Sequence, residues 1–331
     1  MSGLATADVI DLHAHVVLDE TLGAAGRFGP EIGDRNGVPF FRVGDYVLDG
    51  VKYRGSPFMD ANLRLDAMDA AGIDFQVLSP NPLTYFHFVD AATAHAFCRR
   101  HNDALAATVK RYPHRLAGLA ALPMQDPARA IDETKRAVTE LELSGAAIGS
   151  DFGGPLDAAS LDPFYETLVA LNVPLFIHPA PAGIDGPAGD PNLKRFDLDI
   201  VAGFAAQETL AVATLIYGGV LDRHPNLDIW ISHGGGASMF LLGRLADAGR
   251  KRAWAPVALR ADGAFEAGLT RLWFDTHVHA PRSFVMLRGI VGDDRLVFGT
   301  NFAGWDQGTR ADVRAFAAPF ADNARRLLRC S

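Results

Sequence analysis

Short apolar segments rich in β-forming residues recur along the whole chain and alternate with longer segments of helical or loop character. There are eight of them, at residues 9–12, 75–78, 116–122, 145–148, 175–177, 227–231, 272–274 and 296–298. Between them, segments such as 61–71 and 128–143 have helical patterning, and apolar residues of the second fall near one face. Eight strands alternating with helices predict a single (β/α)₈ TIM-type barrel, so residues 1–331 are expected to form one domain.

Two segments interrupt this alternation. Residues 18–58 form an insertion after the first predicted strand, and within it residues 39–43 and 46–54 could pair as a β-hairpin over the barrel mouth. Residues 179–190 are rich in proline, glycine and alanine, which suits a loop after a strand end. Both segments are expected at the face where barrels of this kind place their active sites.

Composition and charge narrow the class of partner. The chain is 49% hydrophobic and 21% charged, which is typical of a globular protein with a large core. Its 31 basic and 39 acidic residues give a net charge of −8, which disfavours nucleic acids and anionic membranes and favours a small molecule. With two cysteines, and neither a signal peptide nor a transmembrane segment in the sequence, we expect a cytoplasmic protein.

Histidines at the ends of predicted strands carry the strongest chemical signal. His13 and His15 end the first strand, and residues two apart in an extended chain point to the same face, which is a metal-ligand spacing. His178 ends the fifth strand and His233 ends the sixth, while Asn301 follows the eighth. Because the carboxyl ends of barrel strands meet at one rim, these side chains are expected to converge there.

Taken together, these motifs resemble the amidohydrolase-related decarboxylases, a family typified by aminocarboxymuconate semialdehyde decarboxylase. The resemblance runs from about residue 9 to 328, through residues 11–15, 119–125, 176–179, 232–236 with 243–244, 275–279 and 298–301. It implies a divalent metal, Zn²⁺ or alternatively Mn²⁺, held by His13, His15, His178 and the position of Asn301. It also implies that His233 is the catalytic acid/base.

The family pattern has aspartate where this chain has Asn301. A neutral carboxamide offers an oxygen ligand without the charge of a carboxylate or its ability to accept a proton. Three explanations stay open: a natural departure with altered chemistry, a protein that binds without turnover, or a deliberate substitution that traps a ligand.

Two arginines and a histidine are candidate substrate-binding residues. A guanidinium can hold a carboxylate through two parallel hydrogen bonds. Arg54 lies in the insertion, near the place where the resemblance implies a substrate-binding arginine. Arg252 matches a position that the family lends to the neighbouring subunit, which implies a homodimer. His279, after the seventh strand, is placed to contact substrate at the rim.

The resemblance therefore implies a metal-dependent non-oxidative decarboxylase, a carbon–carbon lyase acting on a small unsaturated or aromatic carboxylic acid, and the candidate residues are compatible with that chemistry. A second hypothesis keeps the same site but uses a metal-bound water, as a hydrolase or hydratase would. A third is a non-catalytic binding protein or trapped variant in which Asn301 has removed the metal carboxylate.

Overall fold

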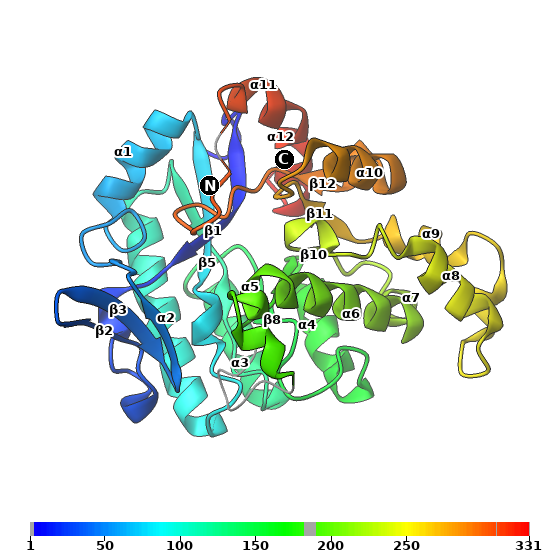
Figure 1. The fold of residues 1–331 in the computed structure, drawn as a ribbon, viewed down its shortest axis with the longest axis horizontal. Coiled ribbons are helices and arrows are strands. Elements are labelled where there is room, and N and C mark those ends of the chain that lie inside the picture. The colour runs from blue at the N-terminus through cyan, green and yellow to red at the C-terminus, as the bar shows by residue number, and fades with distance from the viewer. Residues whose placement is uncertain (1–2, 182–189, 309, 331) are drawn as a thin grey trace.

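The computed structural model describes residues 3–181, 190–308 and 310–330, so part of the proline- and glycine-rich loop, 182–189, lies outside the described residues. Its parallel strands fall where the apolar segments predict them (Figure 1). They are β1 (Ile10–Val16), β5 (Phe75–Pro80), β6 (Leu116–Gly118), β7 (Ala120–Ala121), β8 (Ala146–Gly149), β9 (Leu175–His178), β10 (Ile229–Ile231), β11 (Trp273–Asp275) and β12 (Leu296–Val297).

Hydrogen bonds join these strands into a ring. The strand order is β1-β5-β6 in one sheet and β7 to β12 in the other, and Leu119 between β6 and β7 donates its N–H to Leu78 of β5. At the other end, the N–H of Leu12 donates to Phe298 O, and the N–H of Phe302 donates to His13 O. These bonds link β1 to the residues that follow β12. The predicted (β/α)₈ TIM-type barrel is confirmed.

Helices surround the strands. The larger ones are α1 (Ala61–Ala71), α2 (Ala91–Arg111), α3 (Pro127–Thr139), α4 (Asp162–Leu171), α6 (Gly203–Tyr217), α8 (Leu242–Lys251) and α10 (Pro281–Val291). Shorter ones are α5 (Leu198–Val201), α7 (Val220–Arg223), α9 (Ala264–Leu269), α11 (Val313–Ala317) and α12 (Ala321–Leu327). The stretch Leu198–Tyr217 is long and apolar enough to cross a membrane by length and composition alone, a property that it shares with core helices of soluble proteins.

Side-chain alternation divides the core into two layers. In β9, Leu175 and Ile177 belong to the cluster that packs against the helices, whereas Phe176 between them belongs to a second cluster with Trp230 and Trp273. Successive residues of a strand point to opposite sides, so Phe176 faces the barrel interior. His178, two residues further on, shares that side and lies at the end of the strand.

The insertion forms a small antiparallel sheet. The strands are β2 (Glu31–Arg35), β3 (Val38–Val43) and β4 (Tyr46–Asp49), in that order. Beyond Asp49 the chain turns away at Gly50, whose φ of +79° suits glycine, so residues 50–54 are not part of the strand. Phe41 and Val43 pack with Phe97 of α2, which fixes the sheet beside that helix (Figure 1).

Candidate metal centre and active site

Three buried histidines direct bare ring nitrogens at a common point. His13 Nε2 lies 3.2 Å from His15 Nε2, and His13, His15 and His178 offer ligand atoms that all lie within 4.8 Å of one another. The Nε2 of His178 is buried and has no hydrogen-bond partner among the described residues. Such an arrangement leaves lone pairs facing one another unless a cation lies between them.

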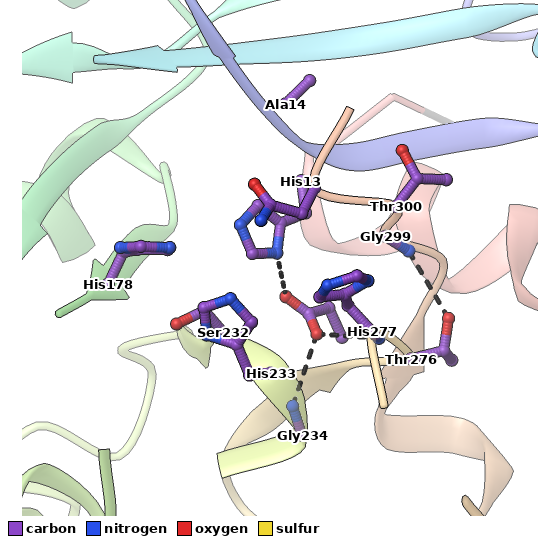
Figure 2. A network of polar contacts seen from close by, with 12 residues as sticks. His13, Ala14, His178, Ser232, His233, Gly234, Thr276, His277, Gly299 and Thr300 are labelled. Atoms are coloured by element: carbon purple, nitrogen blue, oxygen red, sulfur yellow. Dashed lines mark hydrogen bonds and ion pairs between the residues drawn. The ribbon is translucent and has the colours of Figure 1, made fainter. Parts of the chain in front are cut away.

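The other ring nitrogen of each histidine is held by an acceptor. His13 Nδ1 donates to Asp275 Oδ2 at 2.8 Å (Figure 2). His15 Nδ1 lies 3.1 Å from the carbonyl oxygen of Pro80, and His178 Nδ1 lies 2.6 Å from that of Pro179. These bonds place the hydrogen on Nδ1 and leave each Nε2 lone pair for a metal.

Electrostatics keep these imidazoles neutral. Burial, reinforced by His233 nearby, lowers the pKa of His15 to about 3. Burial and neighbouring imidazoles likewise hold the pKa of His13 and of His178 well below the usual value for histidine. Neutral imidazole is the form that binds metals, so the three residues fit a divalent cation.

A bulge in β1 aims His13 and His15 into the barrel. Ile10 and Leu12 belong to the interior cluster, but the register with β5 shifts between Asp11 and Ala14, and Ala14 faces the helices. The shift turns His13 and His15 inward, as bulges beside active sites commonly do. His13 then lies close to the backbone of Gly299. Only glycine leaves room for it, because a Cβ at position 299 would lie 2.8 Å from His13 Cβ.

His233 lies beside the three histidines and is paired with a buried carboxylate. Its ring centroid is 4.9 Å from those of both His13 and His178 (Figure 2). Its Nδ1 donates to Glu208 Oε1 at 2.6 Å, and Ser232 also donates to that oxygen. Burial alone would lower the pKa of His233, but Glu208 raises it to about 9. The pairing with Glu208 therefore favours the charged form of the His233 imidazole.

The glycines after His233 are required by both conformation and space. His233 itself has φ +45°, and the next three residues continue at positive φ. A Cβ on Gly235 would lie 2.6 Å from the ring of Phe274, and one on Gly236 would lie 2.2 Å from Ala205 O. The run of three glycines thus lets the chain turn tightly beneath the imidazole.

Asn301 lies at the rim and is hydrogen-bonded to a carboxylate from the following loop. Its Nδ2 donates to Asp306 Oδ1 at 2.5 Å. The other oxygen of Asp306 accepts from His277 Nε2 at 3.2 Å and from His279 Nε2 at 3.1 Å. Burial would raise the pKa of Asp306, but the hydrogen bond and charge of His277 hold it well below the usual range.

A cavity of about 880 Å³ opens above the centre. His15, His178 and Asn301 contribute to its floor, and Lys52 is the cation that contributes to its wall among the described residues. Much of the remaining wall is aromatic: Tyr46, Tyr53, Phe58, Phe204, Phe302 and Trp305. The cavity suits a small planar molecule with a polar group directed at the histidines.

The arginines chosen from the sequence lie elsewhere. Arg54 is mostly exposed and paired with Asp19 at 3.0 Å, and it does not line this cavity. Arg252 caps the C-terminus of α8, also outside the cavity lining. His279 is at the rim, where its Nε2 contacts Asp306 and its ring packs against that of His277. The structure thus brings His13, His15, His178, His233 and Asn301 together and leaves the arginines apart.

Three acidic residues at the site were not assigned a role from the sequence. Asp275 had only a weak signal, its position at the end of a strand. Glu208 lies inside α6, where no local motif marks it, and Asp306 lies in a loop after β12. Burial of a carboxylate, which a sequence does not display, is the signal that identifies Glu208 and Asp275.

A parallel barrel with three convergent histidines at the carboxyl ends of its strands defines a metal-dependent enzyme of the amidohydrolase type. Comparison with known proteins agrees: the amidohydrolase family profile matches residues 10–330. The chain belongs to the amidohydrolase family, and the resemblance predicted from its motifs is confirmed.

Similar proteins include several decarboxylases. The 2-amino-3-carboxymuconate-6-semialdehyde decarboxylase of Dictyostelium discoideum is 30% identical over 259 residues, covering 77% of this chain and 70% of that protein. The gamma-resorcylate decarboxylase of Rhizobium radiobacter is 29% identical over 305 residues, covering 88% and 87%. A structure of 5-carboxyvanillate decarboxylase from Novosphingobium aromaticivorans, with bound manganese and a nitrobenzoic acid, is 27% identical with a TM-score of 0.70, covering 82% of each chain.

Proposed function

We propose that this protein is a divalent-metal-dependent decarboxylase that removes CO₂ from a small aromatic carboxylic acid. The observation that carries the proposal is the convergence of three buried imidazoles beside the His233–Glu208 pair, with two of the three, His15 and His178, lining an aromatic cavity. The decarboxylases among its relatives support the same reaction class.

Each residue of the site has a part in this reaction. His13, His15 and His178 would hold the metal, with the carboxamide oxygen of Asn301 as a further ligand. The cation would supply positive charge that binds and polarises an oxygen of the substrate. When the carbon–carboxylate bond breaks, its electron pair stays on the ring carbon, and His233 delivers the proton that replaces CO₂. Glu208 orients His233 and stabilises its charged form.

Substrate contacts follow from the cavity wall. Aromatic side chains such as Tyr53 and Phe204 offer faces against which a planar ring packs. Arg54, Arg252 and His279 remain proposed substrate-binding residues. Arg54 would have to leave Asp19 to reach the cavity, and Arg252 would act in the site of a neighbouring subunit.

A direct test of the reaction uses a panel of hydroxylated benzoic acids and unsaturated dicarboxylic acids with the metal-loaded chain. We expect release of CO₂ and of the acid's decarboxylated product. Incorporation of labelled solvent oxygen into product without CO₂ release would instead identify a hydrolase or hydratase. Absence of turnover above a metal-stripped control across the panel would favour a non-catalytic binding protein.

Zinc is the proposed ion. Imidazole suits zinc, whereas carboxylate ligands suit manganese, and Asn301 supplies no carboxylate. Asn301→Asp is therefore expected to raise the affinity for Mn²⁺ relative to Zn²⁺ by roughly 10- to 100-fold, a range known for perturbed metal sites. The new carboxylate would also lie against Asp306, and a bound cation would relieve their repulsion.

Competition dialysis against equal Zn²⁺ and Mn²⁺, followed by elemental analysis, measures this ratio. Asn81→Asp is the matched control, because Asn81 lines the same cavity and gains the same charge outside the proposed ligand set. Equal Mn/Zn ratios in the wild type and Asn301→Asp would show that residue 301 is not a ligand.

We also propose a cytoplasmic homodimer. Exposed apolar side chains flank α8: Phe240 precedes the helix, and Trp254 and Val257 follow its C-cap residue Arg252. A second copy of the chain would cover them. Sedimentation equilibrium is expected to give a dimer for the wild type and a monomer for Phe240→Glu. Val285→Glu, at an exposed position of α10, should remain dimeric; an unchanged mass for Phe240→Glu would place the interface elsewhere.

A further inference from the structure

A second group of potential metal ligands lies at the same rim as the three-histidine centre. His277 and His279 follow β11 with the two-residue spacing that also relates His13 and His15, and Asp306 comes from the loop after β12. The Nε2 atoms of both histidines approach the same oxygen, Asp306 Oδ2, at 3.2 and 3.1 Å. None of these three residues belongs to the first centre.

The separations of these atoms match those around a bound metal. Zinc binds imidazole nitrogen and carboxylate oxygen at about 2.0–2.2 Å, so neighbouring ligands in a tetrahedral site lie roughly 3.3 Å apart. The two nitrogen–oxygen distances are close to that value, and all three ligand atoms lie within 4.8 Å of one another. An ion could therefore enter with small side-chain movements.

Burial gives this group one closed side and one open side. The side chains of His277 and Asp306 are 3% and 12% exposed, whereas that of His279 is 62% exposed. His277 and Asp306 would thus bind an ion on its buried side, and His279 would bind it on the side that is open to solvent. With three protein ligands, it would keep a coordination position for water or for a ligand oxygen.

Asn301 connects the two groups. Its Nδ2 donates to Asp306 Oδ1, which holds the carboxylate in place and leaves Oδ2 directed at the two histidines. Hydrogen bonds of this kind orient metal-binding carboxylates. The same hydrogen bond places the negative charge of Asp306 next to the uncharged side chain of Asn301.

We propose that His277, His279 and Asp306 form a second site for a divalent transition metal, adjacent to the His13–His15–His178 centre and joined to it through Asn301. The ligand set of two imidazoles and one carboxylate suits zinc, manganese and iron(II). This site goes beyond the proposed decarboxylase function, and its existence does not depend on that function.

The test counts metal ions on the full chain. Protein stripped with a chelator is dialysed against Zn²⁺, and separately against Mn²⁺, and the metal per chain is measured by elemental analysis. We expect two ions in the wild type, one in His279→Ala, one in His178→Ala and none in the double variant. Asp306→Asn should also lose one ion. His95→Ala, which changes a histidine of α2 distant in sequence from both groups, should keep two, and circular dichroism checks that each variant is folded.

The pattern of losses decides between the sites. An equal number of ions in the wild type and His279→Ala would overturn the proposal and leave Asp306 as a hydrogen-bond acceptor that positions His277. A single wild-type ion that is lost in His279→Ala but retained in His178→Ala would support this site and refute the first centre. A single ion lost only in His178→Ala would overturn this site and leave the decarboxylase proposal intact.

Discussion

Replacing His178 by alanine is expected to remove the metal ion from the three-histidine centre and to lower the decarboxylation rate about a thousandfold or more. His178 contributes a buried Nε2 for which the protein provides no hydrogen-bond partner among its described residues, so the substitution removes a ligand whose nitrogen is already directed at the ion. A cation that polarises a substrate oxygen contributes several kcal/mol to catalysis, and each 1.36 kcal/mol is a factor of ten in rate.

The measurement pairs metal content with turnover. Elemental analysis should show one ion fewer per chain than in the wild type, and kcat should fall in parallel. His95→Ala is the control, since it replaces a partly buried histidine of α2 that belongs to neither metal group. Wild-type metal content in His178→Ala would contradict the assignment of His178 as a ligand, and wild-type turnover without the ion would contradict a metal-dependent reaction.

The second large effect is expected at His233. His233→Ala should lower kcat by roughly 10²- to 10⁴-fold, the range for loss of a positioned general acid, while metal content stays at the wild-type level. This combination separates a proton donor from a ligand. Substrate affinity should change little, because the proton is delivered only as the carbon–carboxylate bond breaks.

Glu208→Gln tests how much the carboxylate beside His233 contributes to the rate. The amide keeps the shape of Glu208 but removes the charge that stabilises the imidazolium, so kcat should fall less than in His233→Ala. A wild-type rate for His233→Ala would assign proton delivery to another group. A rate for Glu208→Gln equal to that of the wild type would limit Glu208 to a structural contact.

The sequence predicted the parts of the fold that periodicity controls. Each barrel strand is an apolar run buried on both sides, so its position is visible in the composition of three to seven residues. The histidines at strand ends were visible for a related reason: polar residues that terminate apolar strands of one barrel must meet at one rim. His178, two residues beyond the inward-facing Phe176, shows how directly alternation fixes direction.

The sequence could not supply what depends on contacts between distant segments. Simple alternation along β1 places His13 on the side opposite Leu12, and only the bulge seen in the pairing with β5 explains how both residues face the interior. Glu208 lies 25 residues before its partner His233, and Asp306 lies 29 residues after its partner His277. No local sequence pattern indicates a contact between residues so far apart. Asn301 was identified as unusual, but its carboxylate neighbour was not.

The closed ring of strands also determines at which stage of protein synthesis the three-histidine centre can form. Asp11 of β1 accepts hydrogen bonds from the backbone and the hydroxyl of Thr300, a separation of 289 residues, and β1 meets the chain again just beyond β12. Such non-local pairing gives the chain a high contact order, which slows folding because the ends must meet before their contacts stabilise anything. During synthesis, His13 and His15 emerge early, but their setting is complete only when the last strand has left the ribosome. A nascent chain that stops before residue 300 therefore carries the metal ligands without the barrel that holds them in place.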